Sequence, residues 1–457
     1  MKGLECTEIR FSALNDERRF EAEFFRKRFL AEDAALARLP KSLLGDFAAV
    51  TDGPHGYHVV DESSPIAMLT AKCASDWFAQ REEADRIAHW VDEESVRSRL
   101  RNRDIILSTR GTVGMCALVV PEALPANIDQ DVARISWDGE SDFVPEFVTA
   151  YLNSRFGQDH IERYSSGMVQ QGMSLAKVRD IPIPRLGKKL QQAVADCVQT
   201  ALSARRETAS SLQAAETALI SATGLGNWQP PEPLSYTRRA SETFAAKRLD
   251  SDYFSPRVTQ LLARLGASGR TVRDMAPPRH EKFTPAASGN FRYIEISDVR
   301  SDGTTTTESV PMREAPSRAT WRVRAGDVLT STVRPIRRLS ALVMPEQDGC
   351  IASSGFVVLQ PRDVPAEVLL TYLRLPLYCE LMDLHTSASL YPAISETDLL
   401  RLPFPNLPQA TCDAIVQSVR STHTARHRAR TLLDRAKRAV EIAIETDEAT
   451  ALKFLTA

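Results

Sequence analysis

At 457 residues the chain is too long for one compact core, and its length favours roughly two to four domains. Hydrophobic residues make up 43% and charged residues 25%, which is ordinary for a globular protein and excludes a disordered or fibrous chain. The formal net charge of −2 excludes a globally basic nucleic-acid binder, so any positive surface for DNA must be local.

The sequence indicates a cytoplasmic protein without a cofactor or a metal. No run of about 18 apolar residues suggests a membrane span. Residues 1–6 are mixed polar and lack the apolar core of a signal peptide. The scattered cysteines fit neither a disulfide framework nor a zinc site, and we expect free thiols. They are Cys6, Cys73, Cys116, Cys197, Cys350, Cys379 and Cys412.

The most informative feature is an internal repeat that extends over most of the chain. Five short motifs of the first half return in the same order in the second half, at offsets between 220 and 229 residues. The matched pairs are residues 19–25 with 248–254, 104–109 with 327–332, 117–119 with 341–343, 145–152 with 365–373, and 181–184 with 402–405. Because the order is kept and the offsets change little, the matches indicate a tandem duplication.

Each copy is predicted to mix strands and helices in a similar order. Apolar runs of β-type residues predict strands, followed by a helical pattern in each copy. We expect strands at residues 105–107, 115–120, 294–296, 328–329, 340–344 and 356–359, and helices at 146–153 and 366–375. Two Pro-X-Pro segments, 182–184 and 403–405, can continue neither a helix nor a central strand, so each is predicted to be an extended exit.

A long segment poor in Gly and Pro follows each exit. Residues 188–222 have apolar side chains at Leu190, Val194 and Val198, and residues 409–444 show similar spacings of three, four and seven. Such spacings predict amphipathic helices, each about 50 Å long. Since each helix needs a partner for its apolar stripe, we expect the two to pack against each other. Residues 224–233 are rich in Gly and Pro and predict a linker.

The order of these motifs resembles that of the specificity subunits of type I restriction-modification systems. The resemblance covers residues 20–444 and depends on the sequences at 104–114, 151–154 and 166–170, on the Pro-X-Pro exit and on the long helix. The second copy has the variant Thr-Val-Arg-Pro at 332–335. Two departures are the absence of a Glu-Gln pair soon after the first exit, and Arg337-Arg338 where the first copy has Gly114-Met115.

The resemblance implies an α+β fold with two tandem α/β target-recognition domains, each followed by a long helix. The two helices would pair as an antiparallel coiled coil. The corresponding boundaries are 1–186 and 187–223 for the first domain and its helix, 224–247 for the linker, 248–407 and 408–446 for the second pair, and 447–457 for a C-terminal tail.

The resemblance also implies a function and partners. Each domain would recognise one half of a split site in double-stranded DNA, and the helix pair would act as a spacer. Two methyltransferase subunits and a restriction subunit with motor activity would dock on this chain. Recognition domains diverge with their targets, so the base-contacting residues of the family do not carry over.

Arginines cluster beside the same repeated strand in both copies. Their planar guanidinium groups suit phosphates and guanine edges, although a solvated basic face would look the same. In the first copy the candidates for DNA contact are Arg97, Arg99, Arg101, Arg103 and Arg110. In the second copy they are Arg322, Arg324, Arg334, Arg337 and Arg338.

Two further segments are candidates for DNA contact. The Gly-rich turn at 52–58 contains His55 and His58, and its counterpart at 277–282 contains Arg279, His280 and Lys282. Such a turn lets the backbone approach a groove, but it can equally be an ordinary hairpin loop. Gln170 follows a Ser-Gly pair, and glutamine can pair with adenine through two hydrogen bonds. The basic stretch 420–438 fits DNA, an acidic partner or a solvated helix face.

Catalytic signatures are missing from the sequence. No Gly-rich phosphate loop with a Gly-Lys-Ser/Thr ending occurs, and no serine-nucleophile motif is present. The adenine-methyltransferase signature Asn/Asp-Pro-Pro-Tyr/Phe is also absent. We therefore expect a non-catalytic subunit. Two alternatives remain: a protein-interaction scaffold of a related defence system with DNA recognition lost, which the near-neutral charge favours, or a nuclease with diffuse motifs.

Overall fold

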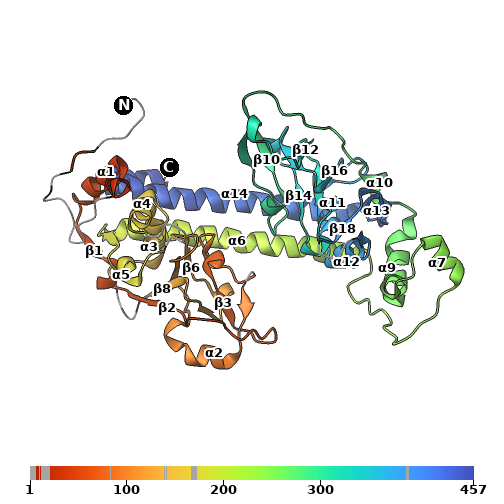
Figure 1. Cartoon of the computed structure of the whole chain (residues 1–457), viewed down its shortest axis with the longest axis horizontal. Helices are drawn as coiled ribbons and strands as arrows, with labels where there is room; N and C mark the ends of the chain where they lie inside the picture. Colours follow the sequence, from red (N-terminus) through yellow and green to blue (C-terminus); the bar gives the residue numbers. More distant parts are fainter. Residues whose placement is uncertain are drawn as a thin grey trace. The chain divides into compact units, whose positions relative to one another are not determined.

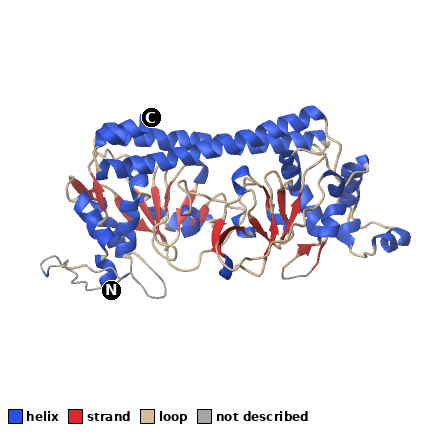
Figure 2. Cartoon of the chain, turned by 90° about the horizontal axis from the view of Figure 1, so that it is seen from above, coloured by secondary structure: helices blue, strands red, loops and turns tan. Residues whose placement is uncertain are grey.

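The computed structural model describes residues 7–9, 11, 21–82, 84–137, 139, 141–165, 172–387 and 391–456. The chain forms two compact units, whose elements are labelled along the chain in Figure 1. Unit 1 contains Met1–Arg205 and His427–Ala457, and unit 2 contains Arg206–Arg426. Each unit contains both strands and helices (Figure 2), which confirms the α+β class predicted from the sequence.

The central element of unit 1 is a four-stranded antiparallel sheet in the order β2-β8-β5-β6. Its strands are β2 (Ala49–Asp52), β8 (Val132–Ser136), β5 (Ile105–Ser108) and β6 (Cys116–Leu118). Because successive side chains of a strand point to opposite faces, Ile105 and Leu107 belong to one buried cluster and Ile106 to another. Both faces are covered, which explains the continuous apolar sequence of β5.

Helices cover one face of this sheet and a smaller sheet covers the other. Phe147, Tyr151 and Phe156 of the covering helices pack in the same cluster as Ile105. The helices of unit 1 are α1 (Lys27–Leu36), α2 (His89–Glu94), α3 (Pro145–Leu152), α4 (Arg155–Tyr164), α5 (Leu175–Arg179) and α15 (Glu448–Thr456). The smaller sheet consists of β4 (Asp85–Arg86), β3 (Ala67–Leu69) and β7 (Ala126–Ile128).

The first Pro-X-Pro exit forms a short strand at a sheet edge. Strand β9 (Pro182–Pro184) pairs in antiparallel fashion with β1 (Lys41–Leu43) in a two-stranded sheet. A two-stranded ladder tolerates proline because only one side of the strand needs donors. In unit 2 the equivalent contact is a single bridge between Thr271 and Pro403. Both exits are extended, as predicted.

Unit 2 contains the same central strands in the same register. Strand β13 (Val328–Ser331) pairs with β14 (Ser340–Leu342) and β16 (Phe356–Leu359). The pair Val328 and Leu342 matches Ile105 and Leu118 of unit 1. At the other end Ser331 lies opposite Phe356, as Ser108 lies opposite Val132. The duplication seen in the sequence therefore extends to strand register.

The remaining elements of unit 2 surround this sheet. A four-stranded sheet contains β11 (Glu308–Pro311), β10 (Asn290–Ile294), β15 (Ile351–Ser353) and β12 (Ala319–Arg322) in that order, and β17 (Thr386–Ser387) pairs with β18 (Ala393–Ile394). The helices are α7 (Ala240–Ala246), α8 (Ser251–Phe254), α9 (Pro256–Leu265), α10 (Val272–Met275), α11 (Ala366–Leu373), α12 (Pro376–Leu384) and α13 (Glu396–Arg401).

One strand starts earlier than the sequence pattern predicts. Residues 294–296 were expected to be a strand, but β10 ends at Ile294. The Glu295 N–H donates to Asp298 Oδ2 at 2.7 Å, and a 3-10 turn occupies Ile296–Asp298. A short Asp side chain that caps the backbone competes with the strand ladder, which explains the difference.

The two predicted long helices are α6 (Lys188–Ala222) and α14 (Gln409–Glu445). Each contributes one part to each unit. In unit 1, Leu190 and Val194 of α6 belong to one buried cluster with Val440 of α14. In unit 2, Leu219 of α6 shares a cluster with Ile415 of α14. The start of one helix thus packs with the end of the other, which confirms the predicted antiparallel pairing.

Candidate nucleic-acid interface

In unit 1 the candidate loops leave the central sheet at one edge. Strand β2 ends at Asp52 opposite Ala133, and β5 ends at Ser108 opposite Val132. The turn before β8 joins both loops, because Gly53 N–H donates to Asp129 O and Thr109 N–H donates to Asp131 O. The segments that contain His55 and Arg110 therefore emerge side by side. We call this edge, with its loops 53–58, 109–114 and 129–131, the unit 1 edge.

A glycine is required where the first loop approaches the turn. A Cβ added at Gly53 would lie 1.8 Å from the carbonyl oxygen of Ile128. Any side chain would force the loop away from the turn. The Gly-rich character of residues 52–58 therefore has a packing reason at Gly53, independent of any ligand.

The charged side chains at the unit 1 edge are exposed and weakly paired. Asp52 accepts from Arg97 at 3.1 Å and lies 3.2 Å from the His55 ring. Arg110 lies 3.5 Å from Asp131. The Arg97 side chain is 69% exposed, and exposed pairs of this kind contribute little to stability. Such cations can therefore exchange a carboxylate for a phosphate at small cost.

Unit 2 has an equivalent edge with different side chains. Thr332 N–H donates to Gly355 O directly after β13, and Arg334 follows in a left-handed conformation with φ of 49°. Its guanidinium carbon lies 5.4 Å from the centre of the exposed Tyr391 ring. The neighbouring Ile336 and Arg337 are exposed. We call this edge, with residues 332–338 and 391–394, the unit 2 edge.

A second loop meets each edge at the same position. Met173 N–H donates to Thr109 O at 2.8 Å in unit 1, and Ile394 N–H donates to Thr332 O at 3.0 Å in unit 2. The candidate Gln170, three residues before Met173 in the sequence, lies outside the described residues. In both units a second loop is thus hydrogen-bonded to the residue that directly follows the central strand, β5 or β13.

Histidines and a lysine flank the two edges. His280 lies 3.0 Å from a carboxylate oxygen of Glu396. Partial burial lowers the pKa of His58, which favours its neutral form. Lys282 is exposed and, among the residues that the structure describes, its side chain makes no hydrogen bond or ion pair. Its backbone pairs with Trp321 of β12.

Other predicted arginines pair with acidic side chains of their own unit. Arg99 lies 2.6 Å from the buried Asp92. Arg322 and Arg324 both reach Glu281, at 3.4 Å and 2.8 Å. These three side chains remain partly exposed.

Two buried carboxylates each bind one arginine side chain and the backbone N–H of one predicted arginine. The Asp104 carboxylate accepts from Arg134 Nε at 2.7 Å and from the Arg101 N–H at 2.8 Å. In unit 2 the Asp327 carboxylate accepts from Arg279 and from the Arg324 N–H in the same way. The turn that contains the aspartate is the same in both units. The arginine whose side chain pairs with that aspartate comes from a different segment in each unit.

Besides Arg334, two further arginines of the repeat, Arg103 and Arg338, lie in the left-handed region. Arg103 has φ of 69° and donates to both oxygens of Glu146, at 3.0 Å and 2.7 Å. Arg338 has φ of 60° and donates to Glu216 of α6 and to the Arg374 carbonyl. Sequence reasoning grouped both with the exposed arginines, because nothing in the local sequence identifies partners 43 and 122 residues away.

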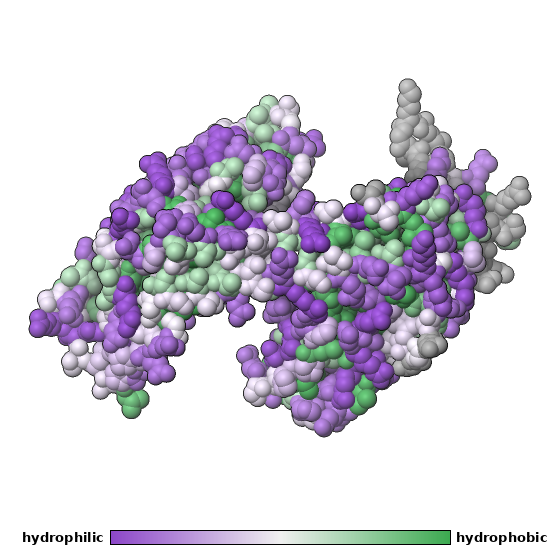
Figure 3. All heavy atoms as spheres, turned by 180° about the vertical axis from the view of Figure 1, so that it is seen from behind, coloured by the Kyte–Doolittle hydropathy of each residue, from purple (hydrophilic) through white to green (hydrophobic). Residues whose placement is uncertain are grey.

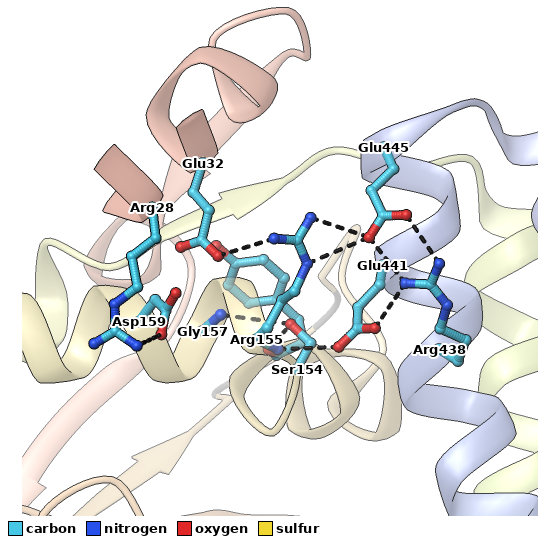
Figure 4. Close-up of polar contacts among 10 residues, drawn as sticks. Arg28, Glu32, Ser154, Arg155, Gly157, Asp159, Arg438, Glu441 and Glu445 are labelled. Carbon is cyan, nitrogen blue, oxygen red and sulfur yellow. Dashed lines mark hydrogen bonds and ion pairs between the residues drawn. The ribbon is translucent and has the colours of Figure 1, made fainter. Parts of the chain in front are cut away.

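Unit 1 also contains a polar network that sequence reasoning missed (Figure 4). Arg155 of α4 donates to Glu32 of α1 at 3.3 Å and to Glu445 of α14 at 3.0 Å, and its N–H donates to Glu441. Arg438 donates to Glu441 and Glu445 from the other side. The network joins three helices of unit 1 and has no sequence signature, because its members lie far apart along the chain.

The pKa of the Glu32 carboxyl in this network lies well above the usual range of a glutamate. Burial, together with a hydrogen bond to Asp159, raises the pKa of Glu32 to about 8, although Arg155 and Arg28 act in the opposite direction. Removal from water disfavours the charged form of an acid. At neutral pH the Glu32 carboxyl is therefore largely protonated.

The described residues offer no metal centre and no membrane span. Among them, no group of three His, Cys, Asp or Glu side chains is arranged to hold a metal ion. The helices of the described part of the chain are too polar or too short to cross a bilayer. Figure 3 shows hydrophilic side chains over much of the visible face, with hydrophobic ones scattered among them.

Comparisons with known proteins find matches among solved structures alone. No protein-family model and no curated protein matches the sequence. The chain is similar to the S subunit of a type I restriction-modification system from M. genitalium, with 13% identity and a TM-score of 0.37, over 91% of this chain and 95% of that chain.

Two further structures are similar to the chain. The HsdS subunit from Thermoanaerobacter tengcongensis is 18% identical with a TM-score of 0.28, over 89% of this chain and 97% of that chain. A structure from work on assembly and conformational transition of the type I R-M system is 18% identical with a TM-score of 0.29, over 90% and 99%. The TM-scores of all three structures lie below 0.5.

Proposed function

We propose that the chain is the DNA-recognition subunit of a type I restriction-modification complex, in which each unit recognises one half of a split site. The observation that supports the proposal best is the duplicated sheet edge. Arg110 and Arg334 follow equivalent strands, while the residues around them differ. A common framework with unlike loops is what recognition of two different sequences requires.

Basic side chains at and beside the two edges are the proposed DNA contacts. In unit 1 they are Arg97, Arg110 and His55, whose acidic partners Asp52 and Asp131 lie 3.1 to 3.5 Å away. In unit 2 they are Lys282, Arg334 and Arg337. Arginine can donate two parallel hydrogen bonds to guanine or phosphate, and Tyr391 beside Arg334 offers an aromatic surface. Arg99, Arg101, Arg322 and Arg324 are proposed as outer phosphate contacts, since each lies near one of these groups along the chain.

Catalysis is proposed to come from partner subunits. The sequence contains no phosphate-binding loop and no methyltransferase signature, and its net charge of −2 leaves room for a partner to contribute to phosphate binding. We propose that methyltransferase subunits and a restriction subunit dock on this chain, and that the paired helices α6 and α14 serve as the spacer.

Selection from a random-duplex library tests this function. The full chain, purified with its methyltransferase partner, is incubated with the library at two salt concentrations. Recovery of a split motif with an affinity that falls with salt supports recognition. Absence of any enriched motif contradicts it, and metal-dependent cutting by the chain alone would identify a nuclease instead.

The alternative of a protein-interaction scaffold has one specific observation in its favour. Many arginines of the basic clusters pair with carboxylates of their own unit, for example Arg103 with Glu146 and Arg279 with Asp327. The same library experiment distinguishes the two functions, because a scaffold would assemble with its partners and still enrich no sequence.

A further inference from the structure

Both units contain a buried glutamate at the first turn of the helix after the central sheet. Glu146 lies in α3 of unit 1 and Glu367 in α11 of unit 2, with side chains 2% and 11% exposed. We call them the junction glutamates. An acidic side chain in the first turn interacts favourably with the helix dipole, but a carboxylate this buried also needs a counter-ion.

Each junction glutamate contacts the long helix of its own repeat at the same position. Gln199 of α6 donates to Glu146 at 2.6 Å, and Arg420 of α14 donates to Glu367 at 2.8 Å. Counting from the first residues of the helices, Lys188 and Gln409, both donors stand 11 positions along. The contact between the long helix and the junction glutamate is therefore present in both repeats.

The arginine that pairs with the junction glutamate comes from a different element in each unit. In unit 1 the helix offers a neutral Gln199, and the arginine comes from the sheet turn as Arg103. In unit 2 the helix offers Arg420, and Gly326 stands where unit 1 has Arg103. Both turn residues have positive φ, 69° for Arg103 and 86° for Gly326. An arginine is strained in that region and glycine is not, and the two hydrogen bonds from Arg103 to Glu146 offset that strain.

We propose that Arg103 and Arg420 are positioning residues, which fix the recognition part of each unit on its long helix by neutralising the junction glutamate. The inference rests on the function proposed above. It assigns to Arg103 a role inside the protein, whereas a direct DNA contact would require its guanidinium to leave Glu146.

The repeat itself supplies the variants that test this assignment. Arg103→Gly removes the guanidinium and keeps the turn conformation that Gly326 adopts in unit 2. Arg103→Gly combined with Gln199→Arg transfers the whole unit 2 arrangement into unit 1. Lys247→Gly is the matched control, because Lys247 also has positive φ, 53°, and lies at the C-cap of the exposed α7.

The readout is the range of gap lengths between half-sites that each variant accepts in the library selection. Arg103→Gly is expected to accept gaps at least one base pair shorter and longer than the wild-type chain, with both half-sites unchanged. The double variant and Lys247→Gly are expected to return the wild-type range. A direct DNA contact predicts instead that the double variant stays as defective as the single one, which would overturn the assignment.

A second pair of variants, in unit 2, keeps the test decisive if a single variant fails to fold. Arg420→Gln leaves Glu367 with a neutral partner, and Arg420→Gln with Gly326→Arg transfers the unit 1 arrangement into unit 2. If a single variant does not fold, the matching double variant decides: a folded double with the wild-type gap range supports the assignment. A folded double with a broadened range contradicts it.

A measurement without DNA separates this inference from the proposed function. Spin labels attached through unnatural amino acids at the exposed positions Thr112 and Ser203 report the distance between the unit 1 edge and α6. The distance distribution is expected to broaden in Arg103→Gly and to narrow again with Gln199→Arg. If the wild-type chain enriches no split motif while these distances change as expected, the proposed function fails and the positioning role stands. Unchanged distributions in Arg103→Gly would overturn the positioning role.

Discussion

Arg134 and Asp104 form a buried ion pair in the central sheet of unit 1, with Arg134 Nε donating to Asp104 Oδ2 at 2.7 Å. Both side chains are at most 7% exposed. In unit 2 the same carboxylate position, Asp327, is balanced by Arg279, whose N–H donates to Val358 O of β16. The arginine thus comes from the segment that runs beside β16, while the buried aspartate and its turn are kept.

The first prediction follows from this exchange. Arg134→Val leaves Asp104 buried without its counter-ion and should destabilise unit 1 by about 3–5 kcal/mol. Thr51 lies opposite Arg134, so adding Thr51→Arg reproduces the unit 2 arrangement and should restore a large part of the loss. Thermal and urea unfolding of the single and double variants measure both effects. A double variant no more stable than Arg134→Val alone would contradict the exchange.

The second prediction concerns Gly53 at the unit 1 edge. Gly53→Ala places a Cβ 1.8 Å from Ile128 O, and the forced shift should cost roughly 1–3 kcal/mol and weaken DNA binding by unit 1. Gly172→Ala at the same edge is the control, since its nearest contact would be 3.7 Å. The melting temperature and the affinity for the selected duplex are measured. Equal behaviour of the two variants would show that the loop is not held at Gly53.

The third prediction separates base contacts from phosphate contacts at the unit 2 edge. Arg337→Ala and Lys282→Ala should each weaken binding to all sequences and reduce the salt slope by about one. Arg334→Ala should change the preferred bases of one half-site, at a cost of about 1–3 kcal/mol.

Arg273→Ala is the control for this set, because Arg273 is exposed on α10 and is not among the residues that form the unit 2 edge. It should leave affinity and half-site preference unchanged. Parallel selections at two salt concentrations give both quantities for each variant. Equal losses in all four variants would mean that binding depends on overall charge alone.

The fourth prediction is a pH dependence that comes from Glu32. The folded chain raises the pKa of this acid from 4.5 to about 8, so the fold binds its proton more tightly than the unfolded chain does. The stabilisation from that proton is complete below pH 4.5 and is lost as pH rises through 8. The melting temperature of the wild-type chain should therefore fall as pH rises from 4.5 to about 8 through this group.

Glu32→Gln carries a neutral amide at every pH and should flatten this dependence. Its melting temperature at pH 9 is expected to exceed that of the wild-type chain, while Glu242→Gln on the exposed α7 should follow the wild-type curve. Melting curves at four pH values check the result. A Glu32→Gln variant that loses stability with pH as steeply as the wild-type chain would assign the effect to another group.

Much of the fold could be predicted from the sequence, because its signals are local. The apolar run at 105–107, the helical pattern after 145 and the low Gly and Pro content of 188–222 each lie within one element. The repeat added weight to each of them, since the same order occurs twice. The limit of β10 at Ile294 could not be predicted in this way, because it depends on the Asp298 side chain capping the backbone at Glu295.

The candidate site was less predictable for a physical reason. An arginine in a basic run looks the same whether it faces solvent or a buried carboxylate. Arg110 lies at an exposed edge beside Asp131, whereas Arg103 pairs with a glutamate 43 residues further along. The positive φ of Arg103 also cannot be predicted from the residue type. The glycine at the equivalent position of the second repeat, Gly326, does indicate a turn with positive φ.

The relocated arginines have a consequence for recombination between the two halves. A chimera that joined the sheet of unit 1 to α14 would bring both Arg103 and Arg420 to one glutamate. The opposite chimera, the sheet of unit 2 on α6, would combine Gly326 with Gln199 and leave Glu367 without a cation. The first chimera keeps a cation beside the glutamate and the second does not, so exchange of the two sheets at this boundary should give a stable fold in one direction only.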